Sequence, residues 1–197
     1  MKKIILMLVC VLSVQILCAQ TAKQILDKTA ATVNAAKGAT ANFVMKGKYG
    51  DAAGTIAIKG NKFMADTKQA KIWYDGKTQW TYMESTQEVN VSTPTEAQQQ
   101  TMNPYRFINL YNMGYSMIKK DVANGYEVYL KATDPKRTIT EMYITVNKYF
   151  IPTNVRMKTV KGWTDIVISN FKRASLSDKT FRFNAKDYPH AEVIDLR

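Results

Sequence analysis

The sequence predicts an α+β fold: a single, strongly curved antiparallel β-sheet, an unclosed half-barrel of about ten or eleven strands with helices covering its concave side. Two observations support this prediction. From residue 40 onward, apolar and polar residues alternate with the period of two that strands have, and the links are too short to contain crossover helices. One strongly apolar helical pattern, near residue 107, interrupts the strands and is a natural cover for one face of the sheet.

Residues 1–19 are predicted to be an export signal that is removed near Ala19. Two lysines precede an almost unbroken apolar run, which is too short to span a bilayer and is followed by small residues. We therefore expect an exported protein in which residues 20–197 form a single domain. Cys18 leaves an alternative open, because lipidation of its thiol would anchor the chain to a membrane.

The chain is strongly basic. Its formal net charge is +12, from 28 basic and 16 acidic residues, and removal of the signal lowers it to +10 (26 − 16). An exported protein seldom meets nucleic acid, and the lysines are spread along strand positions that face solvent, so we expect no nucleic-acid partner. Both cysteines lie within the predicted signal, which leaves the mature chain without a thiol, a disulfide or a cysteine-based metal site.

The first element is a helix over residues 21–37. Thr21 caps its N-terminus, Gln24 completes a capping box, and Gly38 ends it. Its apolar stripe is narrow and rich in alanine, so we expect the helix to lie close against the sheet.

A meander of short strands follows, with turns marked by glycine or by polar residues. The predicted strands cover residues 40–49, 54–59, 62–67, 71–74, 77–83 and 88–92. The hairpin over residues 71–83 is the most specific local prediction, because Asp75-Gly76 is the dipeptide that a two-residue type I′ turn favours. That turn would place Trp73 opposite Thr78. It would also bring three large aromatic residues onto one face: Trp73, Trp80 and Tyr82.

The segment 93–113 breaks the meander. Thr93 begins a polar, glutamine-rich helical turn, and a second start signal at Asn103 opens an apolar helix that ends before Gly114. We expect this second helix to act as a lid over the sheet, with three residues facing inward: Phe107, Leu110 and Tyr111.

Strands resume after this segment. The predicted strands cover residues 115–120, 126–132, 139–147, 150–160, 163–171 and 181–183. Pro152, near the start of one of them, is best tolerated at a sheet edge or a bulge. Residues 188–197 are expected to form a tail that adds a last edge strand.

No group of residues indicates catalysis. The mature chain has no cysteine nucleophile, and its one histidine, His190, lies close to the end in a tail that also contains proline. The acidic residues fall in turns or on polar strand faces, and the sequence has no glycine-rich phosphate loop and no cluster of metal ligands. We therefore expect a protein that is not an enzyme and that needs no cofactor or metal.

Tyrosine, methionine and tryptophan are abundant, with 11, 10 and 3 residues respectively. Methionine suits surfaces that repack around variable apolar partners. In a compact sandwich these residues would fill a closed core. A single curved sheet with one covering helix is hard to fill, so a ligand cavity is an equally good interpretation.

Two stretches resemble a known family: GTIAIKGNKF at residues 54–63 and WYDGKTQWTYMESTQEVNV at residues 73–91, followed by the Asn/Pro-led segment Met102-Asn103-Pro104-Tyr105-Arg106-Phe107. In this order they resemble the LolA-like family of periplasmic outer-membrane lipoprotein carriers, over nearly the whole mature chain. The resemblance implies an unclosed β-barrel with a helical lid. It also implies an apolar cavity that holds the acyl chains of a lipoprotein during transfer from the inner to the outer membrane.

The same resemblance implies three kinds of partner: acylated lipoproteins, an inner-membrane lipoprotein-releasing transporter and an outer-membrane acceptor. We expect the carrier to be a monomer. Gly60 stands where proteobacterial members carry an arginine whose hydrogen bonds hold the lid closed, so the resemblance does not extend to that latch.

The residues expected to line the cavity come from the strands and from the lid. They are Phe43, Met45, Ile56, Ile58, Phe63, Trp73, Trp80, Tyr82, Val89, Val91, Phe107, Leu110, Tyr111, Val128, Leu130, Met142 and Ile144. Two other functions stay open. One is a lipidated outer-membrane acceptor of the same fold, and the other is a module that senses a partner protein or an envelope signal.

Overall fold

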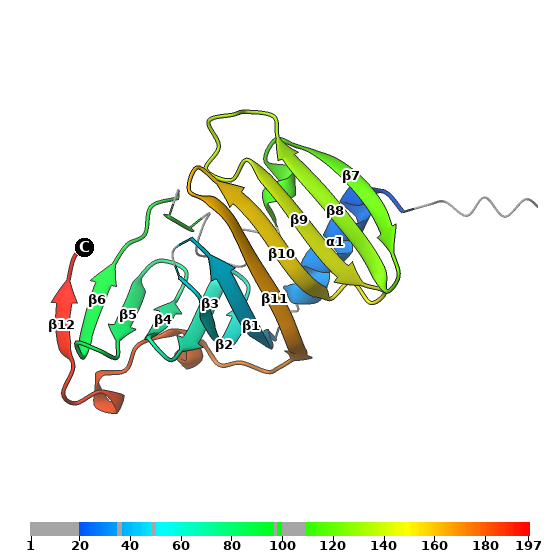
Figure 1. The fold of residues 1–197 in the computed structure, drawn as a ribbon. Coiled ribbons are helices and arrows are strands. Elements are labelled where there is room, and N and C mark those ends of the chain that lie inside the picture. Colours follow the sequence, from blue (N-terminus) through cyan, green and yellow to red (C-terminus); the bar gives the residue numbers. More distant parts are fainter. Residues whose placement is uncertain (1–19, 35–36, 49, 97, 100–108) are drawn as a thin grey trace, which may run out of the picture.

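The computed structural model describes residues 20–34, 37–48, 50–96, 98–99 and 109–197 (Figure 1). Its strands form one 12-stranded sheet in the order β12-β6-β5-β4-β3-β2-β1-β11-β10-β9-β8-β7. The sheet is unclosed, because β12 and β7 are its two edges. The predicted fold class, a single curved half-barrel, is therefore confirmed, with one or two strands more than expected.

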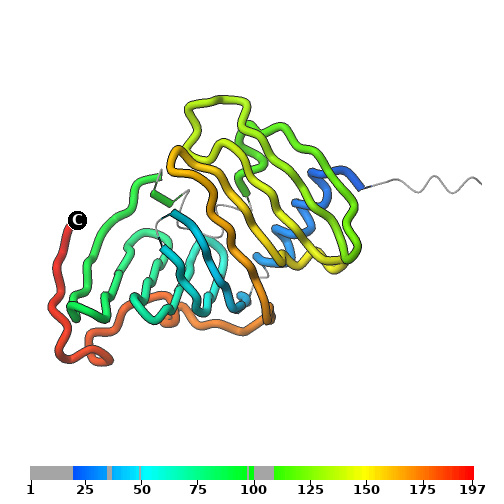
Figure 2. The backbone as a smooth tube through the Cα atoms, in the orientation of Figure 1, coloured from blue at the N-terminus to red at the C-terminus, as the bar shows by residue number. Residues whose placement is uncertain are grey.

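The first half of the sheet consists of β1 (Ala39–Gly47), β2 (Ala52–Lys59), β3 (Lys62–Thr67), β4 (Ala70–Tyr74), β5 (Gln79–Met83) and β6 (Glu88–Ser92). The second half consists of β7 (Tyr115–Val122), β8 (Gly125–Ala132), β9 (Glu141–Asn147), β10 (Pro152–Thr159) and β11 (Gly162–Arg173). Figure 2 shows how β11, late in the chain, returns beside β1 and so joins the two halves.

All neighbouring strands are antiparallel except at one edge. There β12 (Glu192–Asp195) runs parallel to β6, so the tail adds an edge strand as predicted. Pro152 begins β10 at a register shift between Pro152 and Asn154, which agrees with the expected bulge. The proline ring therefore removes no regular ladder hydrogen bond.

Helix α1 (Ala22–Val33) covers the concave side of the second half of the sheet (Figure 1). The predicted capping box is present, because Thr21 Oγ1 accepts from the Gln24 N–H and the Gln24 side chain accepts from the Thr21 N–H. Ile25 and Leu26 are fully buried against the sheet. The helix ends at Val33, earlier than the predicted residue 37.

The predicted turn of the β4–β5 hairpin is wrong. Trp73 pairs with Trp80, not with Thr78, so the loop contains four residues, 75–78. The Asp75 carboxylate explains this, because it accepts hydrogen bonds from the N–H groups of Lys77 (3.1 Å) and Thr78 (2.9 Å). A type I′ turn needs positive φ at both central residues, and here Gly76 has it but Asp75 does not. The two-residue shift keeps Trp73, Trp80 and Tyr82 on a shared face, as expected.

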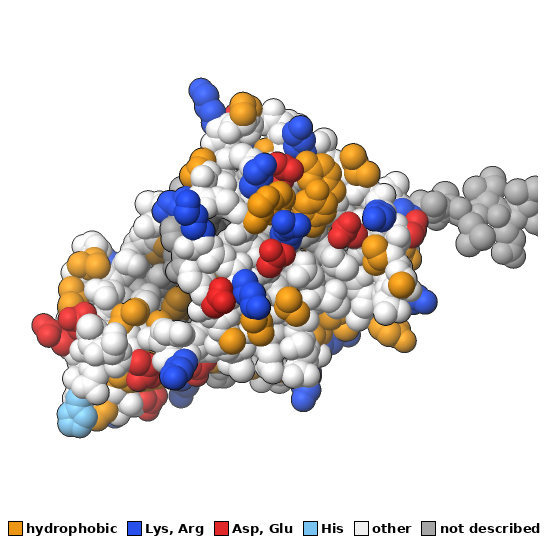
Figure 3. Space-filling view, viewed as in Figure 1, with side chains coloured by type: hydrophobic (Ala, Val, Ile, Leu, Met, Phe, Trp, Pro, Cys, Tyr) orange, Lys and Arg blue, Asp and Glu red, His pale blue; other side chains and the backbone are white. Residues whose placement is uncertain are grey.

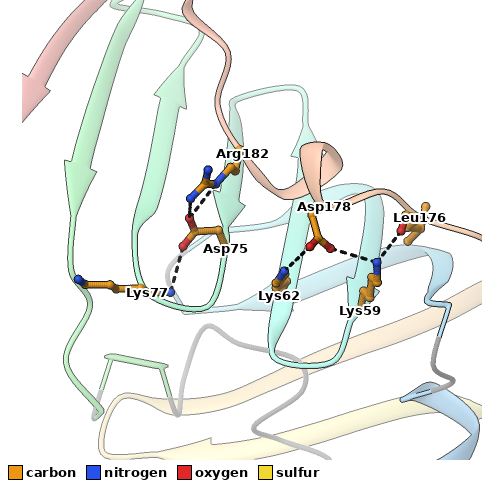
Figure 4. Close-up of polar contacts among 7 residues, drawn as sticks. All are labelled: Lys59, Lys62, Asp75, Lys77, Leu176, Asp178 and Arg182. Carbon is orange, nitrogen blue, oxygen red and sulfur yellow. Dashed lines mark hydrogen bonds and ion pairs between the residues drawn. The ribbon is translucent and has the colours of Figure 1, made fainter.

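The segment 174–191 was only partly predicted. Residues 181–183 form no strand; instead the chain makes two 3₁₀ turns, η3 (Asp178–Phe181) and η4 (Ala185–Asp187). Phe181, the last residue of η3, is fully buried. Figure 4 shows two sets of ion pairs that attach the segment to the ends of β2, β3 and β4. They join Asp178 to Lys59 and Lys62, and Arg182 to Asp75, at 2.9–3.0 Å.

The inserted segment between β6 and β7 differs from its prediction where it is described. Thr95, not Thr93, makes the capping pair with Gln98. The lid helix predicted over 103–113 falls largely on residues 100–108, outside the described residues. Its last part is a 3₁₀ turn, η2 (Leu110–Asn112). Within the described residues, α1 is therefore the one long helix, where two or three helices were predicted.

Candidate functional site: an apolar cavity on the concave face

The concave face of the sheet contains a cavity of about 690 Å³, within the range of sites that bind small ligands. Its walls come from β1–β4 and β9–β11 and from the C-terminal end of α1. The lining residues are Val33, Ala39, Thr40, Ala41, Phe43, Met45, Ala52, Ile56, Ile58, Phe63, Ala65, Thr67, Ile72, Thr138, Ile144, Pro152, Val155, Met157, Thr159, Val160, Lys161, Thr164, Ile166, Ile168 and Phe171.

Strand alternation builds this wall. Alternate residues of β1 from Ala39 to Met45 line the cavity, each paired with a lining residue on a neighbouring strand, and Thr40 joins them at a register shift. Phe43 lies opposite Ile168 of β11, for example, and Ala41 lies opposite Ile56 of β2. Because alanines lie among larger phenylalanine, methionine and isoleucine side chains on β1–β3, the wall has recesses that its own side chains do not fill.

Gly54 belongs to the same face and lies where two strands approach closely. A Cβ atom at this position would lie 1.9 Å from the backbone oxygen of Asp66, closer than atoms approach. Glycine therefore permits β2 and β3 to come together beside Phe43, its partner on β1.

Helix α1 limits how far the cavity extends along the concave side. The helix packs on β7–β10, where its buried residues join the largest apolar cluster. Its C-terminal residues Ala30 and Val33 reach a second cluster with Ile58, Phe63 and Tyr74 of β2–β4. The rest of the concave face of β1–β4 is not packed by α1, and it forms the cavity wall together with residues of β9–β11.

The structure places the predicted site residues in three regions. Those that line the cavity are Phe43, Met45, Ile56, Ile58, Phe63 and Ile144. Those in the closed core beneath α1 are Leu110, Tyr111, Val128, Leu130 and Met142, together with Ile144, which borders both. Those on the opposite, outer face of the sheet are Trp73, Trp80, Tyr82, Val89 and Val91. Phe107 lies outside the described residues.

We expected the aromatic residues of the hairpin to form a wall of the cavity, but they lie on the outer face of the sheet. Phe63 pairs with Tyr74, whereas Trp73 pairs with Met64, so Phe63 and Trp73 point to opposite sides of the sheet. The C-terminal segment then covers the Trp73 side. The Trp73 ring lies 5.6 Å from those of Phe183 and Tyr188, and Tyr82 lies 4.6 Å from Tyr188.

Several wall residues were not among the predicted ones. They include Ile72 of β4 and the lining residues of the two central strands β10 and β11: Val155, Met157, Ile166, Ile168 and Phe171. Their alternation with polar residues was visible in the sequence. What was missing was the pairing of β11 with β1, which closes the middle of the sheet.

A hydrogen bond fixes the one described part of the predicted lid. The Tyr111 hydroxyl donates to Asp27 Oδ1 of α1 at 2.6 Å. Burial and this bond raise the pKa of Tyr111 to about 12. The same bond, with the Lys23 ammonium group at 2.9 Å, lowers the pKa of Asp27. Tyr111 therefore anchors η2 to the helix, next to the cavity and not inside it.

Charge is interleaved on the outer face of β8–β11, where Figure 3 shows basic, acidic and hydrophobic side chains side by side. Lys158 pairs with Glu141 at 2.7 Å and also lies over the Trp163 ring. Among the residues that the structure describes, no group of three or more acidic, histidine or cysteine side chains is placed to hold a metal ion. Nor does any helix in the described ranges have the length and apolar character to span a membrane.

Comparison with known proteins gives a family and a fold. A family model described as "Outer membrane lipoprotein carrier protein LolA" matches residues 12–161. No curated protein matches the chain. A solved structure of an uncharacterized conserved protein from Thermus thermophilus is similar, with 15% identity and a TM-score of 0.60 over 89% of this chain and 99% of that one.

Two further solved structures are similar at lower scores. A LolA superfamily protein from Nitrosomonas europaea has 15% identity and a TM-score of 0.46, with 84% of this chain and 99% of that one covered. LprF from Mycobacterium bovis has 10% identity and a TM-score of 0.43, with 80% and 96% covered.

Proposed function

Because the chain belongs to the outer membrane lipoprotein carrier protein LolA family, we propose that it binds the acyl chains of lipoproteins in the concave-face cavity. We further propose that it carries them through the periplasm from the inner to the outer membrane. The observation that supports this is the cavity of about 690 Å³, most of whose lining residues are apolar.

The energetics suit a carrier. Each acyl methylene removed from water contributes about 0.8 kcal/mol, so a dozen of them contribute about 10 kcal/mol before the cost of ordering the chain. Contact of this kind has no required geometry. A cargo held by it can therefore be released when another apolar site competes, as transfer between membranes demands.

The wall side chains also suit variable cargo. Met45 and Met157 lie on β1 and β10, and their unbranched thioethers adapt to chains of different shape. Alanines between the larger side chains leave recesses rather than a fitted pocket. We therefore propose a binding protein without a catalytic role or a cofactor.

The handover partners belong to the same proposal. We infer loading by an inner-membrane lipoprotein-releasing transporter, delivery to an outer-membrane acceptor, and action as a monomer. The family's latch arginine has no counterpart here, since Gly60 lies in the β2–β3 turn with φ of 55° and carries no side chain. Any closing contact must come from other residues.

The test is the cargo of the native protein. The protein is purified from its own cell envelope, and bound molecules are identified by mass spectrometry. The proposal expects acylated proteins or their lipid-modified N-terminal peptides. A preparation that carries no acylated molecule, from cells in which lipoproteins are abundant, would contradict it.

Cys18 supports a second candidate function, a lipidated acceptor with the same cavity. Residues 1–19 lie outside the described residues, so the fold does not bear on it. Mass spectrometry of the mature N-terminus separates the two. A free end at Gln20 supports the carrier, and a diacylated Cys18 supports the acceptor.

A further inference from the structure

The cavity is not uniform along its length. Its hydroxyl groups gather where β10 turns into β11, where β3 ends and where the β8–β9 loop meets β10. Strand pairing confirms that these places form one end, since Gly47 pairs with Thr164 and Gly54 with Thr67, while the Thr140 N–H bonds to the Lys158 carbonyl. The polar lining residues of this end are Thr67, Thr138, Thr159, Lys161 and Thr164.

The other end is apolar and covered. Its lining includes Val33, Ile58, Phe63 and Phe171, with Thr40 the polar exception. The chain after β11 crosses this end, where the N–H groups of Ala174 and Leu176 bond to the carbonyls of Gly38 and Lys37 at 3.0 and 2.9 Å. The Leu176 side chain lies so close to Gly38 that a Cβ there would be 2.8 Å away from it.

The charged lining residue lies at the hydroxyl-lined end. Among the lining residues that the structure describes, Lys161 carries the one formal charge, and none of these residues is acidic. Lys161 is exposed at the β10–β11 turn, beside Val160, which is 91% exposed. The loops do not add to this difference, because cations lie at both ends: Lys48, Lys68, Lys136 and Arg137 here, beside Asp51, Glu84 and Asp134, and Lys37, Lys59, Lys62, Lys172 and Arg173 at the other end.

A cavity with an apolar, covered end and a hydroxyl-lined end that carries Lys161 matches a molecule that has the same asymmetry. An anionic headgroup gains a compact positive charge from lysine and hydrogen-bond donors from the threonine hydroxyls other than that of Thr67, which already donates to the Ala70 carbonyl at 2.8 Å. The same headgroup at the apolar end would lose its hydration without compensation. The two orientations of an amphiphile in this cavity are therefore unequal in free energy.

We propose that, beyond the acyl chains of lipoproteins, the cavity takes amphiphiles with one acyl chain and an anionic headgroup, a carboxylate or a phosphate. The headgroup lies at Lys161 and the surrounding threonines, and the chain runs toward Phe171. This inference rests on the proposed function, because it requires that the cavity binds acyl chains.

The experiment compares three probes with the same alkyl chain: decanoate, decyl phosphate and decanol. Each displaces a fluorescent apolar dye from the wild-type protein, from Lys161→Gln and from the control Lys148→Gln. Lys148 is an exposed lysine of the β9–β10 turn, at the other end of these strands. The first two probes also separate the sources of the headgroup, a fatty acid or a phospholipid.

The expected result is that at least one anionic probe binds the wild type more tightly than decanol. Lys161→Gln should then lower the affinity for that anionic probe by roughly two- to five-fold, as expected for the loss of an exposed ion pair. The affinity for decanol should not change. Added salt should reduce the difference, and Lys148→Gln should behave as wild type.

Two results overturn the inference in distinguishable ways. If decanol binds as tightly as both anionic probes and Lys161→Gln changes nothing, the headgroup assignment fails while the acyl-binding cavity stands. If none of the three probes displaces the dye, the proposed function fails together with the inference.

Discussion

The hydroxyl of Tyr111 lies 2.6 Å from Oδ1 of Asp27, and this hydrogen bond joins the 3₁₀ turn η2 to helix α1. The two residues are 84 positions apart in the sequence. Tyr111 is 6% exposed, while the Asp27 side chain remains accessible and also pairs with Lys23. The contact fixes where the segment before β7 meets the concave side of the sheet.

Replacing Tyr111 by phenylalanine should lower the free energy of unfolding by about 1 kcal/mol, because it removes a hydrogen bond to a carboxylate without opening a cavity. Urea denaturation at neutral pH measures the change. Tyr149→Phe is the matched control, since Tyr149 is 78% exposed and its substitution should leave stability unchanged. Equal effects of the two substitutions would contradict a structural role for the Tyr111 hydroxyl.

The same bond should make stability depend on alkaline pH. Burial and the Asp27 carboxylate raise the pKa of Tyr111 from 10.0 to about 12. Because the folded-state pKa is the higher one, the contribution is complete below pH 10 and is lost as the pH rises through about 12. The stability advantage of the wild type over Tyr111→Phe should shrink across that window. An advantage that stays constant there would contradict the assignment.

The buried ring of Phe181 should contribute more to the free energy of unfolding than the ion pair of Arg182 does. Phe181→Ala should cost about 3–5 kcal/mol, because Phe181 is fully buried. Arg182→Gln should cost about 1 kcal/mol, since the Arg182 side chain is 67% exposed and the Asp75 carboxylate, 12% exposed, keeps its two backbone hydrogen bonds. Thermal and urea unfolding of both variants test this order, and the reverse order would contradict it.

A substitution on the outer face of the sheet should affect stability, and a substitution on the concave face should affect binding. Trp73→Phe should lower stability by about 1 kcal/mol, because it disturbs the ring contacts with Phe183 and Tyr188, and leave acyl-chain affinity unchanged. Phe43→Asn should weaken acyl-chain binding, because it places an unpaired amide in the cavity wall. If Trp73→Phe weakened binding as much as Phe43→Asn, the assignment of the faces would be wrong.

Local patterns predicted the fold well because each is decided by nearby residues. The capping box of Thr21 and Gln24 and the bulge at Pro152 followed from short-range rules, and the tail was expected to add an edge strand, although its pairing with β6 was not predicted. The prediction of the turn after Tyr74 was wrong, and the reason is also local. The Asp75 side chain stabilises a longer loop than the Asp-Gly dipeptide alone suggests.

The site was harder to predict, because a wall is defined by how strands from distant parts of the chain pair. Phe43 and Ile168 face the cavity together only because β11 lies beside β1. Alternation shows which residues of one strand share a face. It does not show whether Trp73 and Phe63, which lie on different strands, point to the same side of the sheet. The cover over Trp73 comes from Tyr188, more than a hundred residues later, in a segment with no regular pattern.

The central claim, that the concave cavity holds acyl chains, is tested by one matched pair of substitutions. Ala65 lies in the middle of the wall, and Ala53 is exposed on the opposite face of the neighbouring strand. The measurement is a calorimetric titration of an N-terminally acylated lipopeptide into the wild type, Ala65→Phe and Ala53→Phe.

The account predicts that Ala65→Phe weakens the affinity about tenfold or more, since excluding two buried methylenes costs about 1.6 kcal/mol. Ala53→Phe should bind as the wild type does. Unchanged affinity in Ala65→Phe, with the variant folded, would contradict binding in this cavity.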